Sequence, residues 1–212
     1  MSLVQGTLVE FLSKDSEIAI GMVLSVSAKG IRLLLANRRE TTVSERNILF
    51  AGGNVKASLN DLESCIQGLE EANRKREELM GSIDLESLHS LLCEDIKGYS
   101  IEEMAEFLAT SPADDLKAAL LRKLSSERFF FRSKKDGFYP VTLEEVKEAK
   151  EREARRIAQE KEEEMLLKEL KSLWANPKAS MGEKTKSAVN DFLKILLFGN
   201  EAPVPKKIFE LL

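Results

Sequence analysis

The sequence is poor in the residues that hold metal ions and form disulfide bonds. Its 212 residues include one histidine, His89, and two cysteines, Cys65 and Cys93, far apart in the chain. A zinc site needs several such ligands at short, fixed spacings, and a disulfide framework needs a larger set of patterned cysteines. We therefore expect no metal site, two buried small cysteines, and a structural or surface histidine instead of a general base.

Long apolar runs are missing as well. No stretch approaches the roughly 20 apolar residues that cross a bilayer. The N-terminus has acidic residues early and lacks the basic region that begins a signal peptide. The sequence therefore predicts a cytoplasmic protein with no membrane partner.

The common signatures of catalytic and phosphate-binding sites are also absent. The sequence has no GxxxxGK[ST] loop, GxGxxG turn, GxSxG elbow or HExxH helix. The carboxylates of Asp114-Asp115 and Glu162-Glu163-Glu164 could in principle bind Mg²⁺, but a helix start and a solvated helix face explain them more simply. We expect no catalytic residue, no cofactor and no small-molecule ligand in this chain.

Excess positive charge is lacking. The 32 lysines and arginines are outnumbered by 36 aspartates and glutamates, which gives a net charge of -4 and a pI near 5.4. Because non-specific affinity for nucleic acid comes from neutralising phosphates, any contact with RNA must be local.

What is present begins with strand-like patterns in residues 1–53. Thr7, Val9 and Phe11 alternate with Leu8, Glu10 and Leu12, apolar residues recur at every second position from Ile18 to Val26, and turns separate two further short runs. Four or five short antiparallel strands predict a small barrel of SH3-like size, because closing the sheet hides its edges.

Residues 54–82 predict one long linking helix. Leu59, Leu62, Ile66 and Leu69 share a face at spacings of three and four, with Ser58 or Asn60 as the cap and Gly81 as an interruption.

Residues 83–141 predict a winged helix-turn-helix domain. We expect helices over about 84–96, from a capping box at Ser100–Glu103, and over about 113–124. Aromatic runs on both sides of the polar residues 133–136 predict a closing hairpin.

The rest of the chain is charged and helical in pattern. Residues 142–176 predict a long charged helix supported by ion pairs at spacings of three and four, and residues 177–212 predict a C-terminal helical segment. The predicted class is α+β, mainly helical, and the final apolar segment is interpreted as the approach to a further domain.

The predicted hairpin carries the best candidates for RNA contact. Basic side chains can reach phosphates while an exposed aromatic ring stacks on a base, and here Phe129–Phe131, Phe138 and Tyr139 interleave with basic residues. The hairpin candidates are Arg128, Arg132, Lys134 and Lys135, and a second patch on the barrel turns contains Arg32, Arg38 and Arg39. A third run, Arg74-Lys75-Arg76, is interpreted as solvated surface.

The third helix of the winged-helix segment would be the recognition helix in a DNA-binding relative. It begins with Asp114 and Asp115. Carboxylates are repelled by a groove lined with phosphates, which disfavours sequence-specific reading of DNA by this helix.

The order of these parts resembles the N-terminal region of a bacterial and plastid branch of the ribonuclease II/R (RNB) family. The segments that carry the resemblance are Gly6–Phe11, Glu102–Leu108, Arg128–Arg132 leading to Gly137–Pro140, and Pro205–Leu212. The resemblance implies Mg²⁺-dependent 3′-to-5′ degradation of single-stranded RNA by an aspartate cluster in a later domain. No segment here matches that cluster, so the resemblance transfers no catalytic residue to this chain.

The sequence therefore predicts an accessory region of an exoribonuclease that guides single-stranded RNA, weakly and locally, to its own downstream catalytic domain. Mg²⁺ is expected only in that domain. One alternative is a helical interaction or dimerisation module in which residues 55–80 and 142–175 pair with each other or recruit partner proteins. A second alternative is a winged-helix DNA-binding regulator.

Overall fold

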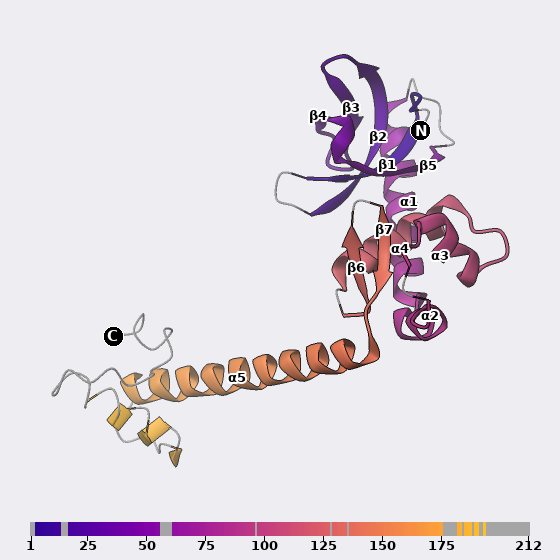
Figure 1. Ribbon diagram of the computed structural model, residues 1–212. Coiled ribbons are helices and arrows are strands. Elements are labelled where there is room, and N and C mark those ends of the chain that lie inside the picture. Colours follow the sequence, from indigo (N-terminus) through magenta and orange to yellow (C-terminus); the bar gives the residue numbers. More distant parts are fainter. Residues whose placement is uncertain are drawn as a thin grey trace. The chain divides into compact units, whose positions relative to one another are not determined.

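The computed structural model describes residues 3–13, 17–55, 61–95, 97–127, 129–134, 136–175, 182–183, 185–187, 189–190 and 193. The chain divides into two compact units, Met1–Val146 and Lys147–Leu212. The first unit contains a five-stranded antiparallel sheet, four α-helices and a two-stranded hairpin (Figure 1). The predicted α+β class is confirmed.

The sheet is formed by the first 54 residues. Its strands are β1 (Thr7–Leu12), β2 (Ile18–Ser27), β3 (Gly30–Leu34), β4 (Glu40–Val43) and β5 (Ile48–Asn54). They lie in the order β4-β3-β2-β1-β5, so a meander of four strands is followed by a fifth that returns to β1. A short 3-10 turn, Glu45–Asn47, joins β4 to β5.

Strand β1 is covered on both of its faces. Val9 and Phe11 pack with side chains from β2 and β3, whereas Leu8 on the other face packs with Met22 and α1. All residues from Thr7 to Phe11 are buried as a result. A strand with one solvated face would show alternation, so this sheet has two apolar faces to cover.

Helix α1 (Leu62–Ser82) covers one of those faces. Cys65, Ile66 and Leu69 are buried against the sheet, as the predicted apolar face requires. Three details of the prediction were wrong: Asp61 caps the helix, Leu62 is 55% exposed, and the helix continues through Gly81. Ser58, Leu59 and Asn60 lie outside the described residues.

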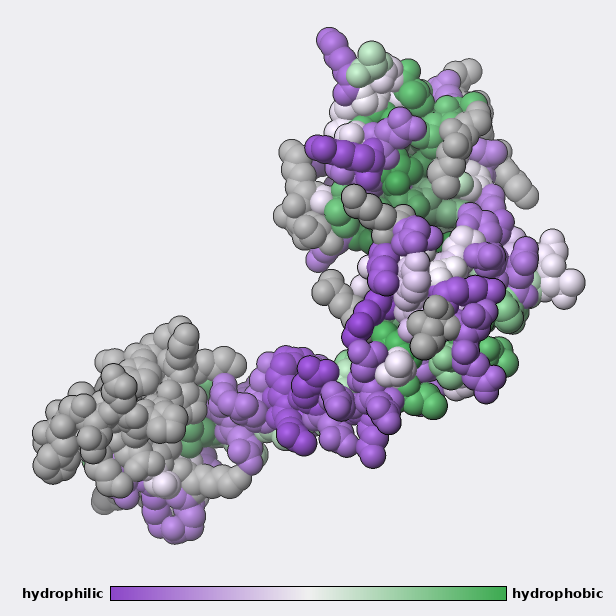
Figure 2. Space-filling model, viewed as in Figure 1, coloured by the Kyte–Doolittle hydropathy of each residue, from purple (hydrophilic) through white to green (hydrophobic). Residues whose placement is uncertain are grey.

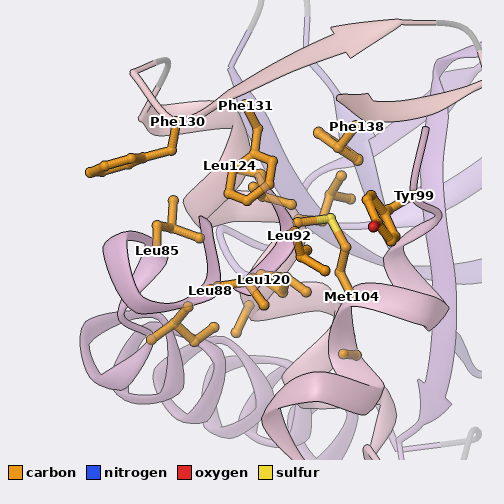
Figure 3. Packing of buried hydrophobic residues seen from close by; sticks show 14 of the residues in the cluster. Leu85, Leu88, Leu92, Tyr99, Met104, Leu120, Leu124, Phe130, Phe131 and Phe138 are labelled. Atoms are coloured by element: carbon orange, nitrogen blue, oxygen red, sulfur yellow. The ribbon is translucent and has the colours of Figure 1, made fainter. Parts of the chain in front are cut away.

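Three shorter helices and the hairpin share a second core (Figure 3). They are α2 (Leu85–Leu92), α3 (Ile101–Leu108), α4 (Asp114–Ser126), β6 (Phe131–Lys134) and β7 (Gly137–Pro140). Asp84 caps α2, and the predicted capping box of Ser100 and Glu103 begins α3. Local sequence signals therefore start both helices where they were expected.

Helix α5 (Leu143–Ala175) is the long charged helix of the prediction, and most of its side chains are exposed. Arg156 forms ion pairs with Glu153 and Glu160, one turn away on either side. Of the C-terminal segment, only a few helical residues between 183 and 193 are described. No described helix has both the length and the apolar composition that spanning a membrane requires.

Candidate nucleic-acid interface

The β6–β7 hairpin separates an apolar face from a basic one. Its register pairs Phe131 with Pro140 and Ser133 with Phe138 on one side, and these apolar residues are buried in the core. The other side presents Arg132 opposite Tyr139 and, one pair along, Lys134 opposite Gly137. Because successive side chains of a strand point to opposite faces, Arg132, Lys134 and Tyr139 share the outer surface.

Tyr139 is the one aromatic residue of the hairpin that is held on this outer surface by polar contacts. The ammonium group of Lys134 lies 3.9 Å from the centre of its ring, and its hydroxyl donates to Asp136 at 2.5 Å. That hydrogen bond lowers the pKa of Asp136 and raises the pKa of Tyr139. Gly98 lets the ring lie close, since a Cβ there would be 2.7 Å from the ring carbon that bears the hydroxyl.

Arg132 is paired across to the start of α5. Its guanidinium donates to Glu145 at 2.8 Å, and both side chains are exposed. Glu145 also accepts a hydrogen bond from the backbone of Thr142. This hydrogen bond is the larger cause, and the one from Arg132 the smaller cause, that holds the pKa of Glu145 below its usual range. Exposed pairs of this kind exchange readily, so a phosphate can compete with Glu145 for Arg132.

The remaining predicted members of this patch divide into two groups. Phe130, Phe131 and Phe138 are buried in the core, and Phe129 packs against it, so these rings are structural. Arg128 and Lys135 lie outside the described residues. The described basic surface of the hairpin consists of Arg132 and Lys134.

Three of the predicted arginines are exposed on the five-stranded sheet: Arg32 lies on β3, and Arg38 and Arg39 lie in the β3–β4 connection. Arg32 donates to Glu40 at 2.6 Å, which raises the pKa of Arg32 and lowers that of Glu40. Arg38, at a left-handed φ of 64°, reaches Glu63 on α1 at 2.8 Å. Arg39 is exposed beside it. Across the described residues, no hydrogen bond or ion pair joins this group to the hairpin.

The interpretation of Arg74-Lys75-Arg76 as solvated surface was wrong for Arg76. Its side chain is 0% exposed and donates to Glu10 of β1, also 0% exposed, at 2.8 Å. It also donates to Asp115 and to the carbonyl oxygen of Gly52. Arg122 of α4 completes the group by donating to both carboxylate oxygens of Glu10 at 2.9 Å and to Asn73 of α1 at 2.8 Å.

We call these residues the junction network: Glu10, Asn73, Arg76, Asp115 and Arg122. It ties β1, α1 and α4 together, and among the described side chains no buried polar atom lacks a hydrogen-bond partner. The sequence does contain a signal for the burial of Arg76, because this residue continues the helical spacing of Ile66 and Leu69. Glu10 likewise occupies the same face of β1 as Leu8.

Helix α4 is enclosed on several sides. Its side chains from Ala118 to Leu121 and Leu124 are buried, and it contacts α1, α3 and β5. At its first turn Asp114 accepts from the backbone of Gly53 at 2.7 Å, and Asp115 accepts from Lys75 and Arg76. The acidic start of the helix therefore has a structural cause, and its first turn is held against β5.

The scarce histidine and cysteines have structural positions. His89 is buried, donates from Nε2 to the carbonyl oxygen of Val141, and packs against Phe130 and Phe131. Cys65 is buried as expected, whereas Cys93 is only partly buried. Within the described ranges, no three His, Cys, Asp or Glu side chains are grouped as a metal ion would need.

Comparison with known proteins identifies no relative: no protein-family model, no curated protein and no solved structure matches this chain.

Proposed function

We propose that this chain is a non-catalytic, RNA-handling region of a cytoplasmic exoribonuclease of the ribonuclease II type. In this proposal it guides single-stranded RNA towards a separate catalytic domain, which supplies the Mg²⁺ chemistry. The observation that carries the RNA-binding part is the outer face of the hairpin, where Arg132 and Lys134 flank the ring of Tyr139.

The chemistry of that face suits single-stranded RNA. Two cations on one strand can track successive phosphates, and a tyrosine ring between them offers a stacking surface for an unpaired base. Lys134 already lies over one face of the ring, so a base that stacks there must displace it. Only two or three phosphate contacts are available, which favours weak and local binding.

The finer fold assignments belong to the same proposal. Five short antiparallel strands with a 3-10 turn before the last favour an SH3-like barrel, and three helices followed by a hairpin favour a winged helix. This order of a barrel, a winged helix and a charged helix supports the resemblance to the N-terminal region of the ribonuclease II/R family.

The position of α4 argues against the DNA-binding alternative. A recognition helix must enter the major groove with its N-terminal residues. Here the first turn of α4 is bonded to Gly53, Lys75 and Arg76, and its apolar residues are buried. Reading a duplex with this helix would require the junction network to open.

The burial of α1 weakens one form of the interaction-module alternative. That form pairs residues 55–80 with residues 142–175 through their apolar faces. The apolar face of α1 is instead buried against the sheet, and the helix also contacts α4. Recruitment of a partner protein by another surface remains compatible with this arrangement.

Binding of the whole chain to a fluorescein-labelled oligouridine, measured by fluorescence anisotropy, tests the proposal. We expect micromolar affinity that falls roughly tenfold between 50 and 200 mM salt, as two or three phosphate contacts to a single strand imply. Arg132→Glu with Lys134→Glu should weaken binding at least about tenfold, and Tyr139→Leu should weaken it roughly fivefold.

The matched control is Arg152→Glu with Arg155→Glu on α5, which changes the net charge by the same amount. If the control weakens binding as much as the hairpin variant, the attraction is general and the hairpin is not the site. An affinity that does not depend on salt would also contradict the proposal.

A further inference from the structure

The basic face of the hairpin is opposed by a carboxylate from the helix that follows it. Helix α5 begins at Leu143, three residues after β7 ends at Pro140 (Figure 1). The guanidinium of Arg132 donates to Oε1 of Glu145, in the first turn of that helix, at 2.8 Å. This pair joins two elements, unlike the pairs that Arg156 forms within α5. The anion that occupies Arg132 therefore comes from the chain itself.

Glu145 is held in place independently of Arg132. Its second carboxylate oxygen, Oε2, accepts from the backbone amide of Thr142 at 3.3 Å and from the Thr142 hydroxyl at 3.2 Å. The same hydroxyl accepts from the amide of Glu145 at 3.3 Å, which is the reciprocal arrangement of a capping box. These contacts leave Oε1 for Arg132. Because the carboxylate is already ordered by its cap, it loses little further freedom when it pairs.

The start of α5 is also fixed to the core beneath the hairpin. Val146, next to Glu145, is buried and belongs to the same core as Phe131. The amide of Val141 donates to the carbonyl oxygen of Phe130 at 2.9 Å. All of these residues lie in the first unit. Packing therefore keeps the first turn of α5 beside the basic face of the hairpin.

An internal anion reduces the affinity of any other anion for the same guanidinium. A ligand that needs the open form of a pair binds with an apparent Kd equal to its intrinsic Kd divided by the fraction that is open. Exposed pairs are weakly favourable, and Glu145 is ordered beforehand, so we expect Arg132 to be open about a quarter to a third of the time. RNA should then bind about three- to fourfold more weakly than it would to an unpaired Arg132.

We propose that Glu145 is an autoinhibitory residue, which keeps the phosphates of single-stranded RNA from Arg132 until a bound strand displaces it. This role rests on the proposed function, in which the hairpin binds RNA. A strand already held at Lys134 and Tyr139 brings its next phosphate to Arg132 at a high local concentration, so it displaces Glu145 more readily than a free anion does. By linkage, RNA binding and the pairing of Arg132 with Glu145 weaken each other by the same factor.

The variant Glu145→Gln separates the two contacts of this side chain. A glutamine still completes the capping box with Thr142 but lacks the charge that pairs with Arg132. Binding of a fluorescein-labelled oligouridine to the whole chain, followed by anisotropy in 50 mM salt, should tighten about three- to fourfold.

The matched control is Glu144→Gln, which removes the same charge from the same helical turn. Glu144 is exposed, and among the described side chains it pairs with no cation. Its removal lowers only the general repulsion of RNA, which salt screens, so binding should tighten by less than about 1.5-fold.

A double variant tests whether Glu145 acts through Arg132. In a chain that carries Arg132→Gln, Glu145→Gln should change the affinity no more than Glu144→Gln does, because the contact is already absent. In the chain with Arg132 intact, the difference between the two glutamine variants should shrink in 200 mM salt, where the pair is screened. Urea unfolding of each variant verifies that the fold is unchanged.

Tighter binding in Glu145→Gln that disappears with Arg132→Gln supports the proposal. It is overturned if Glu145→Gln and Glu144→Gln behave alike, or if the gain persists without Arg132. The proposed function survives both of these results as long as Arg132→Glu with Lys134→Glu weakens binding. If oligouridine binds neither the natural chain nor Glu145→Gln, the proposed function and the autoinhibition are both wrong.

Discussion

Two regions of this molecule use the same ion-pair chemistry in opposite surroundings. In the junction network, Glu10 and Arg76 are 0% exposed, and Arg122 nearly so, at the meeting point of the sheet, α1 and α4. On α5, Arg156 pairs with Glu153 and Glu160 at similar distances, but Arg156 and Glu160 are exposed and Glu153 is partly exposed, and the described part of the helix is mostly hydrophilic in Figure 2.

The difference shows that burial, rather than the number of ion pairs, decides what a pair does. Removing one partner of a buried pair leaves a charge without water or a counter-ion, whereas an exposed charge is simply hydrated again. The junction network should therefore determine how the sheet and helices are held together. The pairs on α5 should support a local helix and little else.

The largest effect is expected from Glu10→Met, which leaves Arg76 and Arg122 without their shared carboxylate. We expect the free energy of unfolding in urea to fall by about 3–5 kcal/mol. Adding Arg76→Met to this variant should recover part of the loss, because the stranded charge is removed with its partner. A loss below about 1 kcal/mol in the single variant would mean that the junction is hydrated.

An intermediate effect is expected from Asp115→Asn. Burial raises the pKa of Asp115, but hydrogen bonds from Lys75 and Arg76 outweigh it and lower the pKa overall. A lowered pKa in the folded state stabilises the protein above the unfolded value of 3.8 and loses that contribution as pH falls through the folded value.

The variant should therefore be less stable than the natural chain at pH 7, by about 1–3 kcal/mol, and the difference should shrink below pH 4. Urea unfolding at pH 7, 5 and 3 measures both the stability difference at pH 7 and its decrease at low pH. A difference that stays constant with pH would show that the carboxylate does not act through its charge.

The smallest effect is expected from Arg156→Gln on α5. Glu153 and Glu160 lose their cation but stay in water, so the urea midpoint should not change measurably. The far-UV circular dichroism should show at most a small loss of helix, and less still in high salt, where the pairs are already screened. A midpoint shift as large as that of Glu10→Met would remove the distinction between the two regions.

Much of the fold could be predicted because its signals are local. The capping box of Ser100 and Glu103, the apolar period of two in β2, and the polar turn between two aromatic runs each identify an element within a few residues. Arg132 and Lys134 were also predictable as outer residues, since the period of two in β6 places Phe131 inside and its neighbours outside.

The pairing within the junction network could not be predicted because its partners are distant in sequence, although the helical spacing of Arg76 places it on the buried face of α1. Glu10 and Arg76 are 66 positions apart, and the pattern Arg74-Lys75-Arg76 looks like any solvated charge run. Nor does the acidic start of α4 reveal its counter-ions. A run of charges tells which side chains are polar, but the partner strand decides which of them is buried.

The separation of Glu10 from Arg122 by 112 residues also bears on how the chain folds during synthesis. A ribosome that adds roughly 5–20 residues per second needs on the order of 10 s between the addition of Glu10 and the addition of Arg122. During that interval the N-terminal sheet has a carboxylate on a face that is not yet closed. A fragment of residues 1–55 would contain the sheet but neither arginine partner of Glu10, so its carboxylate would stay unpaired. The smallest fragment expected to fold well therefore extends through α4.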